Sequence, residues 1–221
     1  MTAHEASLRA DPALVEIWVN GWALTRGTPP PVREGEALRV DVGLPDQRLR
    51  YVYARWSEAV ARRARELDTP WCFLKVCASS EEVRPGLPPA WEIRPPGFMM
   101  RCDGPMRGNA QLPSGYALDL SGGSPVTLAR VFTADGQEAA RGRMACVGDV
   151  AIYDRIATEP GHRRRGLARS LLLALEAVAR ARGSRRGLLV ATTDGRALYE
   201  TLGWNLHSLY TTAVIPGPEG V

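Results

Sequence analysis

The chain has 221 residues, of which 45% are hydrophobic and 24% charged, and its formal net charge is +4. This composition is ordinary for a soluble globular protein of one or two domains, and it excludes a chain that is mainly disordered. No apolar run is long enough to span a membrane, and the N-terminus lacks the pattern of a signal peptide, so we expect a cytoplasmic protein. The four cysteines show no C-x-x-C spacing, which predicts buried free thiols and no metal site.

The first half of the chain predicts alternating helices and strands. Asp11 can cap a helix in which Pro12 takes the first position. The predicted elements are a helix at 11–26, strands at 38–42 and 50–54, a helix at 57–67, a strand at 71–76, a short helix from Ser79 or Ser80 that ends by Pro85, and a strand at 98–102. Residues 103–115 are rich in Gly, Pro and Asn. We therefore predict two domains, 1–108 and 109–221.

The second half predicts strands at 116–120, 126–132, 137–147 and 149–158, a helix at 166–182, a strand at 187–192, a helix from Thr193 or Asp194 to Leu202, and a strand pair or one long bent strand at 204–215. The order strand, helix, strand, helix, strand at 49–102 thus recurs at 149–215. This recurrence has two explanations, a degenerate duplication or the generic likeness of βαβ units, and the sequence leaves both open.

The stretch from Arg155 to Arg169 carries the clearest chemical signal. A predicted strand ends at Thr158, a short turn follows, and a helix begins near Gly166. Backbone N–H groups at the start of a helix lack acceptors and carry partial positive charge, so this junction is suited to an anion such as a pyrophosphate. The stretch contains neither G-K-[ST] nor G-x-G-x-x-G, which excludes the usual nucleoside triphosphate and dinucleotide loops.

This segment resembles the GNAT superfamily of acyl-CoA-dependent N-acyltransferases. Arg163-x-x-Gly166-x-Ala168 matches its R/Q-x-x-G-x-G/A motif, and the segment from Ala197 to Trp204 is similar to its A-x-x-L-Y-x-x-x-G-F/W pattern in compressed form. The resemblance covers roughly residues 116–215. It implies an α/β (α+β) fold with a mixed, splayed sheet flanked by helices, to which residues 1–108 would add a further α/β half that is itself a candidate degenerate repeat.

The resemblance also implies a cofactor and roles for single residues. Acetyl-CoA, or another acyl-CoA, would be the cosubstrate, and no metal is implied. Tyr199 would protonate the departing thiolate. The cofactor-binding residues would be Ile156, Ala157 and Thr158 for the pantetheine arm, and Arg163, Arg164, Arg165, Gly166, Leu167, Ala168 and Arg169 for the pyrophosphate. The family motif does not assign the general base, for which Asp154 is a candidate through water.

Each of these side chains also has a structural interpretation. Tyr199 could pack with its helix neighbours, and Asp154 could pair with a nearby arginine. His162 is better placed to touch phosphate or solvent than to act as a base, while His207 and Tyr210 are weaker candidates for lining an acceptor pocket. Arg163, Arg164 and Arg165 have no aromatic residues interleaved with them, which disfavours nucleic-acid binding.

We predict an enzyme, an acyl-CoA-dependent N-acetyltransferase that moves a small acyl group to an amine of a small molecule or peptide. A non-catalytic acyl-CoA-binding or scaffold protein of the same fold is the alternative. The family usually covers its acceptor site with two helices after its first strand, but here only residues 121–125 separate the corresponding strands. We therefore expect residues of about 11–100, with their tryptophans, to wall that site. The oligomeric state stays open, a homodimer included.

Overall fold

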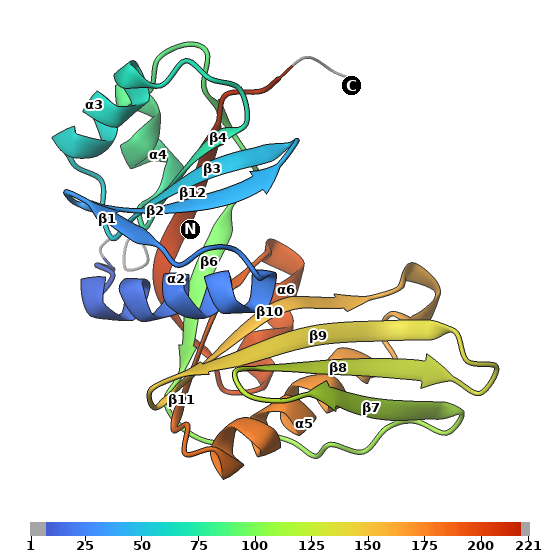
Figure 1. Cartoon of the computed structure of the whole chain (residues 1–221). Helices are drawn as coiled ribbons and strands as arrows, with labels where there is room; N and C mark the ends of the chain where they lie inside the picture. The colour runs from blue at the N-terminus through green and yellow to red at the C-terminus, as the bar shows by residue number, and fades with distance from the viewer. Residues whose placement is uncertain (1–7, 218–221) are drawn as a thin grey trace. The chain divides into compact units, whose positions relative to one another are not determined.

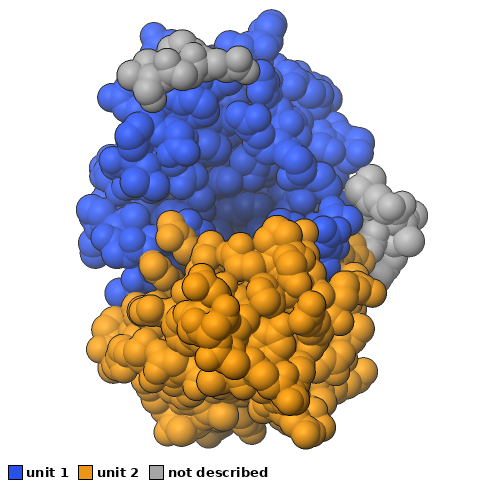
Figure 2. Space-filling model, turned by 90° about the vertical axis from the view of Figure 1, so that its right-hand side faces the viewer, with its two compact units in different colours: residues 1–100, 190–194, 206–221 blue, residues 101–189, 195–205 orange. Residues whose placement is uncertain are grey.

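The computed structural model describes residues 8–217, in which twelve strands form one open, mixed sheet flanked by helices (Figure 1). The strand order is β1-β2-β3-β4-β12-β6-β11-β10-β9-β8-β7, and β5 pairs with β12. This architecture confirms the predicted mixed α/β fold. The chain divides into two compact units, which Figure 2 colours separately: unit 1 holds residues up to 100 with 190–194 and the segment from 206 onward, and unit 2 holds 101–189 and 195–205.

Unit 1 contains most of the first half of the chain. Its elements are α2 (Pro12–Arg26), β1 (Val32–Glu34), β2 (Ala37–Leu44), β3 (Gln47–Tyr53), α3 (Glu58–Glu66), β4 (Cys72–Val76), α4 (Ser80–Val83), a 3-10 helix (Arg84–Gly86), β5 (Glu92–Ile93) and the first part of β6 (Gly97–Cys102). Asp11 caps α2 by accepting a hydrogen bond from the Ala13 amide at 2.9 Å, as predicted. The short strands β1 and β5 were not predicted, because two or three residues cannot show an alternating pattern.

The core of unit 1 lies between α3 and the sheet. Leu74 and Val76 of β4, Val60 of α3 and Ala213 of β12 are fully buried in it. Trp91 is 1% exposed there, and its indole N–H donates to the Ala64 carbonyl at 3.0 Å. Trp91 is therefore a core residue of unit 1.

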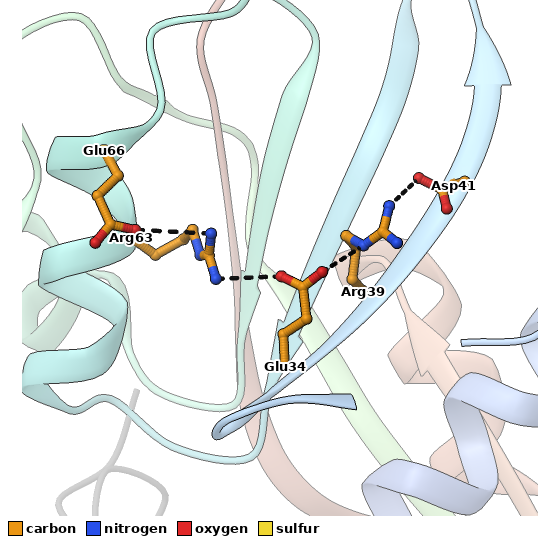
Figure 3. Close-up of polar contacts among 5 residues, drawn as sticks. All are labelled: Glu34, Arg39, Asp41, Arg63 and Glu66. Carbon is orange, nitrogen blue, oxygen red and sulfur yellow. Dashed lines mark hydrogen bonds and ion pairs between the residues drawn. The ribbon is translucent and has the colours of Figure 1, made fainter. Parts of the chain in front are cut away.

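A network of charged side chains joins the β1–β2 hairpin to α3 within unit 1 (Figure 3). The Glu34 carboxylate lies 2.7 Å from Arg39 Nε and 3.2 Å from an Arg63 guanidinium nitrogen. Arg63 also lies 3.6 Å from Glu66, and Arg39 is paired with Asp41. All five side chains retain contact with solvent, so the network supports the hairpin without forming a buried charge cluster.

Unit 2 is an antiparallel meander that ends in a parallel crossover. Its elements are β7 (Tyr116–Gly122), β8 (Val126–Thr133), β9 (Glu138–Val147), β10 (Val150–Thr158), a 3-10 helix (Pro160–His162) and α5 (Leu167–Ala181), with most of β11 (Arg186–Ala191) and of α6 (Thr193–Thr201). Helix α5 covers one face of β8, β9 and β10 (Figure 1). Gly142 on β9 permits this packing, because an added Cβ would lie 2.7 Å from Leu171 of α5 and 2.5 Å from Ile156.

The C-terminal strand β12 (Asn205–Val214) is one continuous strand, so the second of the two predicted alternatives is correct. Its residues from 206 onward belong to unit 1, where Thr211–Val214 pair with Val76–Phe73 of β4. The compact units therefore do not follow the order of the chain, and the predicted division at 108/109 remains a prediction. Both units contain an antiparallel pair followed by a parallel strand–helix–strand crossover, β2-β3-α3-β4 in one and β9-β10-α5-β11 in the other.

Candidate active site

The carboxyl end of β10 separates from its parallel neighbour in unit 2. The ladder between β10 and β11 runs from Val150↔Arg186 to Ile152↔Leu188, whereas β10 continues to Thr158. On its other side β10 pairs with β9, with a bulge between Asp154 and Ala157. Strand β10 thus extends beyond its ladder with β11 through Ile156, Ala157 and Thr158. An extended ligand chain can lie alongside a strand only where no neighbouring strand is paired with it.

A bulge residue with unusual backbone geometry marks this site. Arg155 has φ +53°, a conformation that non-glycine residues adopt rarely. Ile156 points to the face that α5 covers, since it meets Gly142 there. The extra residue of the bulge therefore changes the direction of the strand at the point where it leaves β11.

The turn after β10 presents the start of α5. Arg164 has φ +62°, and Gly166, the N-cap of α5, has φ +83° with no side-chain cap. The N–H groups of Leu167, Ala168 and Arg169 lie in the first turn of a helix, where no intrahelical acceptor exists. A Cβ added to Gly166 would meet no protein atom within 4 Å, so the approach to these amides is open. The start of α5 is therefore uncapped and open, and the anion site at this position stays a prediction.

The arginine side chains of this turn have acceptors within unit 2. Arg163 donates to the Thr158 carbonyl at 3.3 Å, Arg165 to the Tyr116 hydroxyl at 3.0 Å, and Arg169 to the Thr201 hydroxyl at 3.2 Å. His162 Nδ1 also lies 2.9 Å from the Tyr116 hydroxyl. These three arginine side chains and His162 thus have partners in unit 2, whereas the N–H groups at the start of α5 have no intrahelical acceptor.

Tyr199 on α6 is buried close to Asp154. Its side chain is 7% exposed and packs against Trp204 with the ring centres 5.8 Å apart, while Trp204 packs against Tyr153 at 5.5 Å. Burial raises the pKa of the Tyr199 phenol well above its usual range, and the negative charge of Asp154 raises that pKa further. The structure therefore brings the two predicted catalytic side chains, which are 45 positions apart in the chain, within electrostatic reach of each other.

The weaker candidates lie in unit 1. His207 Nε2 accepts a hydrogen bond from the Asp11 amide at 3.0 Å, and the Tyr210 ring packs edge-on against Trp18 at 5.6 Å. Both residues thus have partners at helix α2.

An arginine-lined pocket in unit 2 was not predicted from the sequence. Its lining includes Arg130, Arg141, Arg143 and Arg155, which come from β8, β9 and the bulge of β10. Arg141 and Arg143 are two positions apart, so strand alternation alone could have placed them on one face. Their relation to Arg130 and Arg155 required the strand register.

Two further features bear on the class of site. Among residues 8–217, no group of three His, Cys, Asp or Glu is arranged to hold a metal ion. None of the helices in that range is both long and apolar enough to cross a membrane.

Comparison with known proteins confirms the resemblance seen in the sequence. Residues 127–206 match the family model described as acetyltransferase (GNAT) domain, and curated protein sequences gave no match. A GCN5-related N-acetyltransferase from Kribbella flavida is similar over 94% of this chain and 96% of its own, with a TM-score of 0.65 and 14% identity. A GCN5-related N-acetyltransferase from Sphaerobacter thermophilus matches over 96% of each chain, with a TM-score of 0.58 and 14% identity.

A tandem GNAT protein from the clavulanic acid biosynthesis pathway is also similar. It matches 86% of this chain and 83% of its own, with a TM-score of 0.51 and 16% identity. At these identities the likeness concerns the fold. It extends over both halves of the chain, well beyond the segment that the family model matches.

Proposed function

We propose that the protein is an N-acyltransferase that moves an acetyl or other small acyl group from acyl-CoA to an amine. The observation that carries this proposal is the arrangement around β10: a strand end that leaves its parallel neighbour, with the uncapped start of α5 immediately after it. The match of residues 127–206 to the acetyltransferase (GNAT) domain supports it.

The backbone of unit 2 would hold the cosubstrate. Ile156, Ala157 and Thr158 offer strand N–H and C=O groups to the amides of the pantetheine arm. The N–H groups from Arg164 to Arg169 bind the pyrophosphate, helped by the partial positive charge of the helix start. Gly166 fits this role on two grounds, since its φ of +83° favours glycine and the space beside its Cα is open.

Asp154 and Tyr199 supply the proton transfers. The nitrogen of a neutral amine forms a bond to the acyl carbon, and the bond from that carbon to the CoA sulfur breaks. Asp154, directly or through water, accepts the proton that the amine loses. Tyr199 donates a proton to the departing thiolate, and its raised pKa keeps the phenol protonated before that step.

Gly166→Glu tests the proposed cofactor site. The new carboxylate would lie where the phosphates bind, so calorimetry should show that CoA affinity is lost. Gly148→Glu is the matched control, because Gly148 also has a positive φ, also has open space beside it, and lies in the turn before β10. Undiminished CoA affinity in Gly166→Glu, with the control also binding, would contradict the assignment.

The second candidate function is acyl-CoA binding without transfer. The close packing of Tyr199 against Trp204 favours it, because that contact alone could explain a tyrosine at this position. Release of free thiol from acetyl-CoA in the presence of a panel of amines separates the two functions, since a binding protein would retain the thioester.

A further inference from the structure

The hydroxyl of Tyr116 lies beside the turn that precedes α5 in unit 2. Tyr116 is the first residue of β7, where it is the register partner of Thr133 on β8. Its hydroxyl oxygen lies 2.9 Å from His162 Nδ1 and 3.0 Å from a guanidinium nitrogen of Arg165. A side chain of the sheet thus contacts two residues of the turn, which lie 46 and 49 positions further along the chain.

One hydroxyl group can satisfy both contacts. A guanidinium has no acceptor, so the hydroxyl oxygen accepts the hydrogen bond from Arg165. The hydroxyl hydrogen is then available to His162 Nδ1, which accepts it in the neutral tautomer that carries its hydrogen on Nε2. The two rings also pack edge to face, with their centres 5.7 Å apart. The Tyr116 hydroxyl therefore bridges His162 and Arg165.

The backbone between these two contacts is unusual. Arg164 has φ +62°, a left-handed conformation that persists in an arginine only where the surrounding structure holds it. His162 lies two positions before Arg164 and Arg165 lies one position after it, so the bridge restrains the chain on both sides of this residue. Gly166 and the first amides of α5 follow directly. The positions of those amides thus depend on the conformation of residues 162–165.

We infer that Tyr116 is a positioning residue of the cofactor site: its hydroxyl holds His162 and Arg165, and thereby fixes the turn whose amides bind the pyrophosphate of acyl-CoA. This inference rests on the proposed acyl transfer and adds a residue that lies outside the segment matched by the family model. A turn that is already ordered loses less conformational freedom when its ligand binds, so the contribution of the hydroxyl should appear in the affinity for CoA.

Tyr116→Phe tests the inference, because it removes the hydroxyl and keeps the ring contact with His162. Calorimetry should show a Kd for CoA that is roughly threefold to tenfold higher, the usual effect of losing a hydrogen bond or two. In thiol release with the best amine of the panel, KM for acetyl-CoA should rise by the same factor and kcat should be unchanged. Acetyl-pantetheine carries the thioester without phosphates, so its kcat/KM should be the same in the variant and in the wild type.

Tyr53→Phe is the matched control, because it removes a hydroxyl that is hydrogen-bonded to Arg63 in unit 1. It should leave the affinity for CoA unchanged. Two substitutions of His162 test the bridge from its other side. His162→Ala removes the acceptor, whereas the side-chain oxygen of His162→Asn can accept the hydroxyl hydrogen in its place. The affinity for CoA should fall in His162→Ala and be partly restored in His162→Asn.

The hydrogen bond itself can be observed without any ligand. In protein labelled with 15N-histidine at about pH 8, where histidine is mainly neutral, His162 Nδ1 should show the signal of an unprotonated nitrogen. That signal should shift in Tyr116→Phe, because its hydrogen-bond donor is lost.

The outcomes separate this inference from the proposed acyl transfer. If Tyr116→Phe weakens CoA binding but no amine releases thiol, the role of Tyr116 is supported and the acyl transfer is wrong. If thiol is released and Tyr116→Phe leaves KM for acetyl-CoA unchanged, the acyl transfer is supported and this inference is overturned. An equal loss of kcat/KM with acetyl-pantetheine also overturns it, as does unchanged CoA affinity in His162→Ala. Failure of the wild type to bind CoA would overturn both.

Discussion

At the scale of single residues, Tyr199 is the proposed proton donor to the departing thiolate. Tyr199→Phe should lower turnover by a factor on the order of 10² to 10⁴, the usual effect of a positioned acid, and should leave CoA affinity unchanged because the ring remains. Tyr51→Phe, which alters a buried tyrosine of unit 1, should leave turnover unchanged. Steady-state thiol release measures both, and an unaffected rate in Tyr199→Phe would mean that solvent protonates the thiolate.

Lys75, the only lysine in the chain, is predicted to make stability depend on pH. It is 9% exposed and donates to the Thr212 hydroxyl at 2.9 Å. Burial lowers its pKa well below the usual value, and the positive charges of Arg50 and Arg26 lower that pKa further.

In the unfolded chain Lys75 keeps an ordinary lysine pKa of about 10.4. At a pH between the lowered pKa and about 10.4, Lys75 is therefore protonated in the unfolded chain but neutral in the folded chain. The free energy of unfolding should therefore rise with pH through this window, by up to about 1.4 kcal/mol per pH unit from this group. Lys75→Met should be more stable than the wild type at neutral pH, and the difference should shrink toward pH 10. Lys75→Arg, which cannot lose its proton, should be less stable than Lys75→Met throughout. Urea unfolding at several pH values measures these free energies. If the difference in the free energy of unfolding between Lys75→Met and wild type does not change with pH, the prediction is wrong.

At the scale of elements, the charged network of Figure 3 stabilises the β1–β2 hairpin against α3. Glu34→Gln weakens two ion pairs at once, and its side chain is 33% exposed, so we expect a loss of about 0.5–1 kcal/mol in the free energy of unfolding at low salt. The loss should be smaller in 1 M salt, where charges are screened over about 3 Å. Glu58→Gln, which breaks a single pair with Arg65 whose carboxylate is 74% exposed, should have little effect. Equal losses in both variants would show that the network adds nothing beyond separate surface pairs.

At the scale of the whole molecule, the division of the chain into units gives a test with fragments. Unit 1 takes Ala213 and Ile215 from the end of the chain into its core, and β12 supplies the antiparallel partner of β4. A fragment of residues 1–108 lacks this strand and would leave an apolar edge of β4 unpaired. We expect it to be unfolded or aggregated by circular dichroism and light scattering. Adding a peptide of residues 204–221 should restore structure, and a fragment that folds alone would support the division at 108/109.

Local signals in the sequence were enough to predict the elements with strong periodicity or clear caps, such as α2 after Asp11 and α5 after Gly166. The proposed anion site could also be predicted in this way, because a glycine before an amphipathic helix can be recognised without any tertiary contact. Contacts between residues far apart in the chain could be found only in the folded protein. The proximity of Asp154 to Tyr199, the arginine pocket around the β10 bulge, and the assignment of β12 mostly to unit 1 all depend on strand register and crossover connections. Register is set by the burial of whole sheet faces, so no local pattern in the chain could have specified these three features.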